Sequence, residues 1–88
     1  MNHRRWYSDE FKSELGKLKR QDLGLFGRLT NKIERIMENP EHYARSKSRY
    51  RMRGTSLAYM GRFVIYLEVD GDLVKFYSVK HQDEVFGY

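Results

Sequence analysis

Basic side chains gather in a stretch of this chain that contains no acidic residue. Between His42 and Leu67 there is no Asp or Glu, although the chain as a whole has 12 acidic residues beside 17 Lys and Arg. The basic residues of the stretch are Arg45, Lys47, Arg49, Arg51, Arg53 and Arg62. Because solvated surfaces normally mix the two signs of charge, this separation is typical of a site that binds a polyanion or an acidic protein.

Three of these arginines alternate with other residues. Arg49, Arg51 and Arg53 are two positions apart, and side chains at this spacing on a strand lie on the same face of a sheet. We predict that the row binds phosphate groups, because like charges in a row repel one another unless an anion lies across them. The alternative is a solvated strand edge whose charges prevent pairing with another sheet.

Arg62 and His81 are the side chains best suited to chemistry on a phosphate. Arg62 stands at the head of an apolar strand, where its guanidinium can bind a phosphate through two hydrogen bonds. His81 stands at a polar strand end, and histidine exchanges protons near neutral pH, so it can act as an acid or a base. Lys80 can add positive charge beside it, and we expect Asp83 and Glu84 to orient His81 or Lys80. For each cation the alternative is a solvated surface charge.

The composition gives no support for a metal or disulfide site. The chain has no Cys, which excludes thiolate ligands, thiol nucleophiles and disulfide bonds. Its three histidines, His3, His42 and His81, are too far apart in the sequence for the usual spacing of metal ligands. We therefore predict no metal and no cofactor.

The first half of the chain predicts a short strand followed by two helices. Residues 4–7 can form the strand, and Ser8 can cap a helix whose apolar residues Phe11, Leu15 and Leu18 share one face. A second helix starts near Gln21 or Asp22. Its apolar stripe consists of Phe26, Leu29, Ile33, Ile36 and Met37, and it stops at Asn39-Pro40 because a residue before proline avoids the helical conformation.

The second half of the chain predicts strands. Residues 50–53 and 56–60 have strand character, and residues 63–69 form the strongest strand, apolar enough to be central and covered on both faces. Residues 70–72 read Asp-Gly-Asp, a hairpin turn, after which residues 73–80 return antiparallel. We predict an α+β fold with the order β-α-α-β-β-β, a helical hairpin on one face of a small, mainly antiparallel sheet, and the other face left for function.

Length and hydropathy predict one domain that stays in the cytoplasm. The 88 residues, 1–88, suffice for a single small core. The longest apolar run, residues 63–67, is far shorter than a membrane helix, and no apolar segment of signal-peptide length follows the N-terminus.

The order of elements and several short segments resemble a known family. A helical hairpin ending in Glu38-Asn39-Pro40 is followed by a basic loop and by the segments GRFVIY at 61–66, VDGD at 69–72 and HQDEVF at 81–86. This pattern is similar to the RelE/ParE superfamily of toxins, and within it to the RelE branch of ribosome-dependent mRNA interferases. The resemblance covers residues 4–88.

The resemblance implies an enzyme that cleaves mRNA in the ribosomal A site without a metal. The ribose 2′-OH attacks the adjacent phosphorus, leaving a 2′,3′-cyclic phosphate and a 5′-OH. Such toxins belong to type II toxin–antitoxin systems, so the resemblance also implies an acidic antitoxin as partner and a toxin–antitoxin hetero-oligomer. The antitoxin would cover the basic stretch.

Carried over to this chain, the resemblance assigns catalysis to Arg62, His81 and Tyr88, and RNA binding to Arg49, Arg51, Arg53, Lys80 and Phe86. Two positions depart from the family pattern. Phe63 stands where relatives usually have Arg, with Arg62 one residue earlier, so a bulge at Gly61 would be needed to keep Arg62 on the same face. Phe86 stands where many relatives have a base-stacking Tyr, and an extended tail would place Tyr88 on the same side as Phe86.

Two other functions fit the same architecture. One is a ParE-like toxin that inhibits DNA gyrase by binding and catalyses no reaction. The other is a basic RNA- or ribosome-binding module, for which the departures at Phe63 and Phe86 are the main support. Cyclic-phosphate ends on mRNA would identify the nuclease, and arrest of supercoiling would identify the gyrase inhibitor.

Overall fold

The predicted succession of strands and helices is confirmed. The computed structural model describes residues 3–48, 52 and 54–86, without the side chains of residues 85 and 86. The strands are β1 (Arg4–Tyr7), β2 (Ser56–Met60), β3 (Phe63–Asp70) and β4 (Leu73–His81). The helices are α1 (Asp9–Gln21), α2 (Leu23–Glu38), α3 (Pro40–Tyr43) and α4 (Gln82–Phe86). The short helices α3 and α4 are additions to the predicted order.

Side-chain caps fix where the two long helices begin. The Ser8 Oγ accepts a hydrogen bond from the Phe11 N–H at 3.0 Å, and the Asp22 Oδ1 accepts one from the Leu25 N–H at 3.0 Å. Each cap satisfies a backbone donor that the first turn of a helix leaves without a partner. At the other end, α2 stops at Glu38 as predicted, and Pro40 opens α3 because a proline is tolerated in the first turn of a helix.

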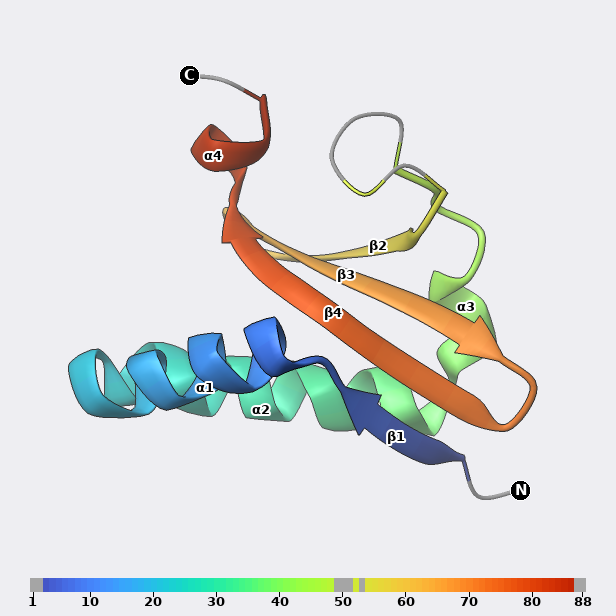
Figure 1. Ribbon diagram of the computed structural model, residues 1–88, viewed down its shortest axis with the longest axis horizontal. Helices are drawn as coiled ribbons and strands as arrows, with labels where there is room; N and C mark the ends of the chain where they lie inside the picture. Colours follow the sequence, from blue (N-terminus) through green and yellow to red (C-terminus); the bar gives the residue numbers. More distant parts are fainter. Residues whose placement is uncertain (1–2, 49–51, 53, 87–88) are drawn as a thin grey trace.

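The four strands form one mixed sheet in the order β1-β4-β3-β2 (Figure 1). β1 runs parallel to β4, whereas the β2–β3 and β3–β4 pairs are antiparallel. β3 and β4 therefore occupy the centre of the sheet, and the two edges belong to the short strands β1 and β2.

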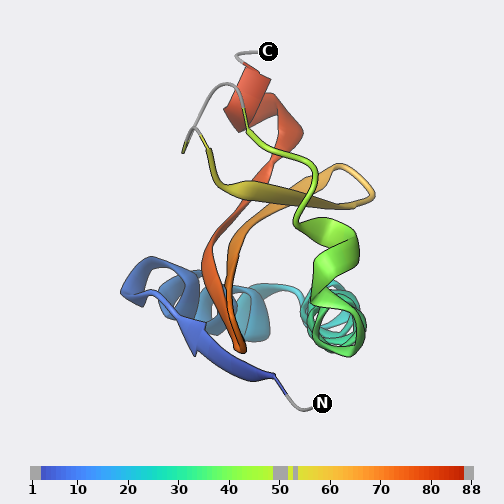
Figure 2. The same cartoon turned by 90° about the vertical axis from the view of Figure 1, so that its right-hand side faces the viewer.

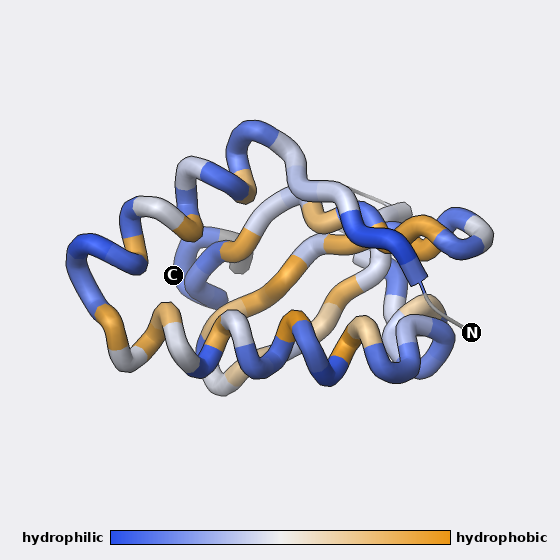
Figure 3. The backbone as a smooth tube through the Cα atoms, turned by 90° about the horizontal axis from the view of Figure 1, so that it is seen from below, coloured by the Kyte–Doolittle hydropathy of each residue, from blue (hydrophilic) through white to orange (hydrophobic). Residues whose placement is uncertain are grey.

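The two long helices cover one face of this sheet. Figure 3, seen from the helix side, shows hydrophobic residues along the strands between α1 and α2. The buried core consists of Phe11, Leu29, Ile33, Ile36, Ala58, Met60, Ile65, Leu67, Val74, Phe76 and Val79. Figures 1 and 2 show α4 at the end of the molecule away from α1 and α2.

β3 is buried on both faces, as its sequence predicts. Ile65 and Leu67 pack in the core under the helices, while Val64 and Tyr66 alternate with them and are also 1% exposed or less. The pairing register between β3 and β4 shifts between Tyr66 and Leu67, so β4 has one extra residue at Tyr77. This bulge lies in the middle of the β3–β4 ladder, away from Gly61, where a bulge would have been needed to keep Arg62 on the same face.

Two tight turns with a glycine in first position connect the last three strands. Met60 pairs with Phe63 across Gly61-Arg62, and Asp70 pairs with Leu73 across Gly71-Asp72. Gly61 and Gly71 have φ angles of 58° and 60°, a conformation that side-chain-bearing residues rarely adopt. The hairpin predicted at residues 70–72 is thereby confirmed.

Two predictions of extended chain are corrected. Met52, inside the stretch expected to form a strand at 50–53, has a φ of 53°, which is left-handed and incompatible with a strand. The tail after His81, expected to be extended, turns into α4. Among the described residues, no helix combines the length and the apolar composition needed to cross a membrane.

Candidate functional site

Arg62 and His81 lie together at one end of the sheet. The last pair of the β3–β4 ladder joins Phe63 to His81. The Gln82 backbone N–H donates a hydrogen bond to the Arg62 carbonyl at 2.7 Å, and the Gln82 Nε2 donates to the Gly61 carbonyl at 3.4 Å. The turn between β2 and β3 is therefore tied to the end of β4.

The Gly61-Arg62 turn holds Arg62 at the surface. Arg62 precedes β3 and is not part of a strand, so its side chain is not bound to either face of the sheet by strand alternation. It is exposed, and within the described part of the chain it forms no ion pair. Phe63 enters β3 and packs against the core, whereas Arg62 stays in the turn before the strand. The assignment of Arg62 to phosphate binding stays a prediction.

Asp83 contacts the His81 ring, as expected from the sequence. The Asp83 backbone N–H donates a hydrogen bond to the His81 Nδ1 at 3.1 Å, which places the proton of the neutral ring on Nε2. The Asp83 Oδ2 lies 3.5 Å from the same Nδ1 and can pair with the ring once Nδ1 is protonated. Protonation of Nδ1 would replace the backbone hydrogen bond by an ion pair with the Asp83 carboxylate.

The His81 ring lines a pocket of about 270 Å³ beside the C-terminal half of α1. Besides His81, the pocket is lined by the apolar residues Leu18, Phe63 and Val79 and by the polar or charged residues Glu14, Lys17, Gln21, Lys80 and Glu84. The ring meets Phe63 edge to face, with 5.2 Å between the ring centres. Because paired residues share a face and Phe63 packs on the core, His81 points toward α1, whereas we expected it on the face that the helices leave open.

The positive charge of Lys80 is paired with carboxylates of α1. Its Nζ lies 2.8 Å from the Glu14 Oε2 and 3.7 Å from the Glu10 Oε2, and its side chain is 21% exposed. The hydrogen bond that Lys80 donates to the Glu14 carboxylate, with a smaller contribution from the charge of Glu10, raises the pKa of Lys80 above its ordinary value. The assignment of Lys80 to RNA binding stays a prediction, and any RNA must compete there with two carboxylates.

Glu14 is a key residue that the sequence reasoning missed. Besides Lys80, its carboxylate accepts hydrogen bonds from the Val79 N–H at 2.9 Å and the Ser78 hydroxyl at 3.3 Å. β1 pairs only with residues 73–76 of β4, so Glu14 covers the edge of β4 that β1 leaves open. An acid flanked by Phe11, Leu15 and Leu18 on the apolar side of α1 is the signal that could have identified it.

The open face near the β3–β4 hairpin is charge-balanced. The Lys75 Nζ lies 3.6 Å from Glu68 and 3.7 Å from Asp70. Burial, followed by a hydrogen bond of 3.0 Å from its hydroxyl to Glu68, raises the pKa of Tyr77. Arg62, which among the described residues forms no ion pair, lies at the opposite end of the sheet.

The remaining predicted site residues lie outside the described part of the chain. These are Arg49, Arg51, Arg53, Tyr88 and the side chain of Phe86. The prediction that Phe86 and Tyr88 share one side rested on an extended tail. Residues 82–86 are helical instead, so that premise does not hold. Among the described residues, no group of three His, Asp or Glu side chains is placed to hold a metal ion.

The fold is that of RelE-like toxins. A chain of the toxin–antitoxin complex RelBE2 from Mycobacterium tuberculosis superposes with a TM-score of 0.73 at 15% identity, over 92% of this chain and 99% of that one. YoeB from a Staphylococcus aureus dimer gives 0.72 at 13% identity, over 92% and 98%. YafQ from E. coli gives 0.65 at 16% identity, over 93% and 96%. This confirms the fold expected from the sequence resemblance.

No family model matches the chain. No curated protein matches it either.

Proposed function

We propose that this chain is the toxin of a toxin–antitoxin pair and cleaves mRNA in the ribosomal A site. The observation that carries the proposal is the hydrogen bond from the Gln82 N–H to the Arg62 carbonyl, which ties the turn carrying Arg62 to the strand end carrying His81. Cleavage of an RNA phosphate needs a cation that holds the growing charge and a group that transfers a proton, and Arg62 and His81 supply one of each at the same end of the sheet. The RelE-like toxin fold supports the same reading.

In the proposed reaction RNA supplies its own nucleophile. The 2′-oxygen bonds to phosphorus, its proton passes to a water molecule, and the bond from phosphorus to the 5′-oxygen breaks. Arg62 binds the phosphoryl oxygens, whose negative charge grows in the transition state. His81, protonated and paired with Asp83, donates its Nε2 proton to the leaving 5′-oxygen. The products are a 2′,3′-cyclic phosphate and a 5′-OH, and no metal or cofactor takes part.

The other assigned residues act on binding or assist catalysis in this proposal. Arg49, Arg51, Arg53, Lys80 and Phe86 contact the RNA, and Tyr88 assists at the catalytic centre. The cationic stretch also attracts an acidic antitoxin, which forms a hetero-oligomer with the toxin in the cytoplasm. The likeness to a chain of a toxin–antitoxin complex supports this partner.

The test compares Arg62→Ala and His81→Ala with the wild type. In a translating extract, the wild type should produce mRNA fragments with cyclic-phosphate ends. Each variant should lose about 100-fold in cleavage rate, the usual effect of removing an acid or a charge-stabilising donor. Their melting temperatures should stay close to that of the wild type because both side chains lie at the surface end of the sheet.

His42→Ala is the matched control, since His42 lies on α3 and contacts Tyr43 rather than the site. It should cleave like the wild type. Wild-type protein that leaves mRNA intact but arrests supercoiling by gyrase would replace the nuclease with the ParE-like function. Binding to ribosomes with neither effect would identify the non-catalytic module.

A further inference from the structure

We propose that the groove between α2 and β2 is a second RNA-binding surface, which extends the path of the substrate away from Arg62. This inference rests on RNA being the ligand in the proposed function. The groove has a volume of about 670 Å³ and lies between α2 and the end of β2. Three basic side chains of α2, Arg28, Lys32 and Arg35, line it.

The three cations form one row. They are four and three positions apart on α2, so they share a face of the helix and span about 10 Å along its axis. Within the described residues none of them forms an ion pair. Lys32 is steadied by the ring of Tyr43, 5.0 Å from its Nζ, a contact that leaves its charge uncompensated.

The acidic residue nearest the centre of this row is already engaged. Glu34 lines the groove, but both of its carboxylate oxygens accept hydrogen bonds from the Arg5 guanidinium of β1. This contact lowers the pKa of Glu34, so its charge is satisfied from within the chain. Glu38 is the other acid of the groove, which leaves an excess of positive charge facing solvent.

The row begins at the turn that carries Arg62. A terminal nitrogen of Arg28 lies 3.2 Å from the position that a Cβ on Gly61 would occupy. A phosphate chain held by Arg62 therefore needs only to cross this turn to reach Arg28. The remaining two cations then continue along α2 at intervals of roughly 6 and 4.5 Å.

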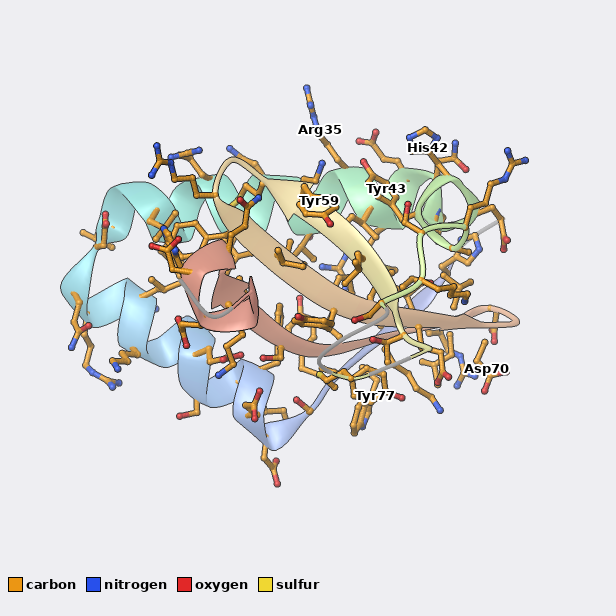
Figure 4. All side chains as sticks on the ribbon, turned by 90° about the horizontal axis from the view of Figure 1, so that it is seen from above. Arg35, His42, Tyr43, Tyr59, Asp70 and Tyr77 are labelled. Carbon is orange, nitrogen blue, oxygen red and sulfur yellow. The ribbon has the colours of Figure 1, made fainter. Side chains whose placement is uncertain are left out.

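Tyr59 adds an aromatic surface to the groove. Its side chain comes from β2 and the residue is 47% exposed, which is unusual for a large aromatic ring. Figure 4 shows Tyr59 and Arg35 on the same side of the molecule, with Tyr77 on the other side. A cationic row beside an exposed ring is the combination that binds single-stranded nucleic acid, through the backbone and through base stacking.

The alternative occupant is an acidic peptide that adds a strand to β2, and the available edge is short. The Leu57 N–H donates to the Ser46 carbonyl at 2.7 Å, so the start of the outer edge is already paired within the chain. Backbone groups of successive residues point to opposite edges, which leaves Tyr59 as the outward-facing residue before the strand ends at Met60. One residue offers too little ladder for strand addition, and RNA is therefore the favoured ligand.

The experiment compares RNAs of two lengths on the double variant Lys32→Glu/Arg35→Glu. The probes are fluorescent 2′-O-methyl oligouridylates of 4 and 12 nucleotides, which cannot be cleaved because the 2′-oxygen is blocked. Wild-type protein should bind the longer probe at least 10-fold more tightly, since only that probe reaches from Arg62 to Arg35. The variant should lose this gain, and the slope of its log affinity against log salt should fall by about 1.4, or 0.7 for each lost contact.

Lys12→Glu/Lys19→Glu is the matched control, because it makes the same charge change at exposed positions of α1 outside the groove. It should keep the length-dependent gain. Equal losses in the two double variants would overturn the inference in favour of a general charge effect. A loss confined to binding of a polyglutamate peptide, with RNA unaffected, would assign the groove to an acidic protein.

These readings are independent of cleavage. Protein that shows the length-dependent gain but leaves mRNA uncut would refute the proposed nuclease and retain the groove. If the protein cleaves mRNA in a way that depends on Arg62 and His81 but shows no length-dependent gain in affinity, the proposed nuclease stands and the RNA-binding groove is refuted.

Discussion

Lys80 and Arg62 are cations at the same end of two neighbouring strands, yet the structure gives them opposite environments. Lys80 lies in β4, beyond the part of the strand that pairs with β1, and two carboxylates from α1 approach its Nζ. Arg62 sits in the turn before β3, exposed and, among the described residues, without an ion pair. Lys80 helps to hold α1 on the sheet, whereas the charge of Arg62 is available to a ligand.

This difference shows that position in the fold decides what a basic residue does. Glu14 satisfies Lys80 together with a backbone N–H and a hydroxyl, so the Glu14 cluster (Glu14, Ser78, Val79 and Lys80) behaves as a structural unit. Among the described residues, no acid forms an ion pair with Arg62. The contrast leads to three predictions on stability.

The largest effect is expected from Glu14→Ala. The substitution leaves a mostly buried Lys80 with only its weaker partner Glu10, and it removes the acceptor of the Val79 N–H. Removing one partner of a largely desolvated pair, together with a backbone acceptor, should lower the free energy of unfolding by about 2–3 kcal/mol. Urea denaturation measures this loss.

Two variants sharpen that measurement. Glu14→Gln keeps an oxygen that can accept from Val79, so it should lose less than Glu14→Ala. Arg62→Ala should change the free energy of unfolding by less than about 0.5 kcal/mol, the usual range for surface residues. If Arg62→Ala proved as destabilising as Glu14→Ala, the two cations would not differ in the way described.

A smaller effect is expected from Gly61→Ala. Its φ of 58° is left-handed, and an added Cβ would lie 3.2 Å from the terminal nitrogen of Arg28. Forcing a side-chain-bearing residue into this region costs about 1–2 kcal/mol, while the guanidinium can move aside. Thermal denaturation should show the loss, with Gly27→Ala in α2 as a control, since nothing lies within 4 Å of its added Cβ.

The same Gly61 substitution also tests the site. The turn positions both Arg62 and the start of the α2 row. At a temperature where Gly61→Ala is fully folded, its cleavage rate should therefore still be lower than that of the wild type. Unchanged cleavage would mean that the turn geometry is not needed to place Arg62.

The smallest effect is expected in alkaline solution. Glu14 raises the pKa of Lys80 in the folded chain above its ordinary 10.5. The stabilisation is fully present below that ordinary value and is lost as the pH rises through the raised pKa, because only then does the folded protein release the proton. Above pH 10.5 the wild type should therefore lose stability more steeply than Lys80→Met. Parallel curves for the two proteins would show that the ion pair contributes nothing.

Much of the fold could be predicted because its signals are local. Ser8 as a helix cap, the stop at Asn39-Pro40 and the Gly71 turn each depend on a few neighbouring residues, and all were found as expected. The helices α3 and α4 were missed because four or five residues are too few to show helical periodicity.

The candidate site was harder to predict than the fold. Arg62 and His81 were chosen from the family resemblance together with their residue types and their places at strand ends. Their actual proximity depends on the pairing of Phe63 with His81, and the orientation of the His81 ring depends on which face Phe63 occupies. Neither follows from the spacing of residues within one strand.

The sequence by itself determined the elements, their order and the segregation of charge, because periodicity, caps, turns and composition act over short distances along the chain. Only the tertiary structure decided which charges are satisfied, since Glu14 meets Lys80 across 66 positions and Glu34 meets Arg5 across 29. Electrostatic pairing depends on distance in space, so it becomes visible only when the helices and strands are packed together.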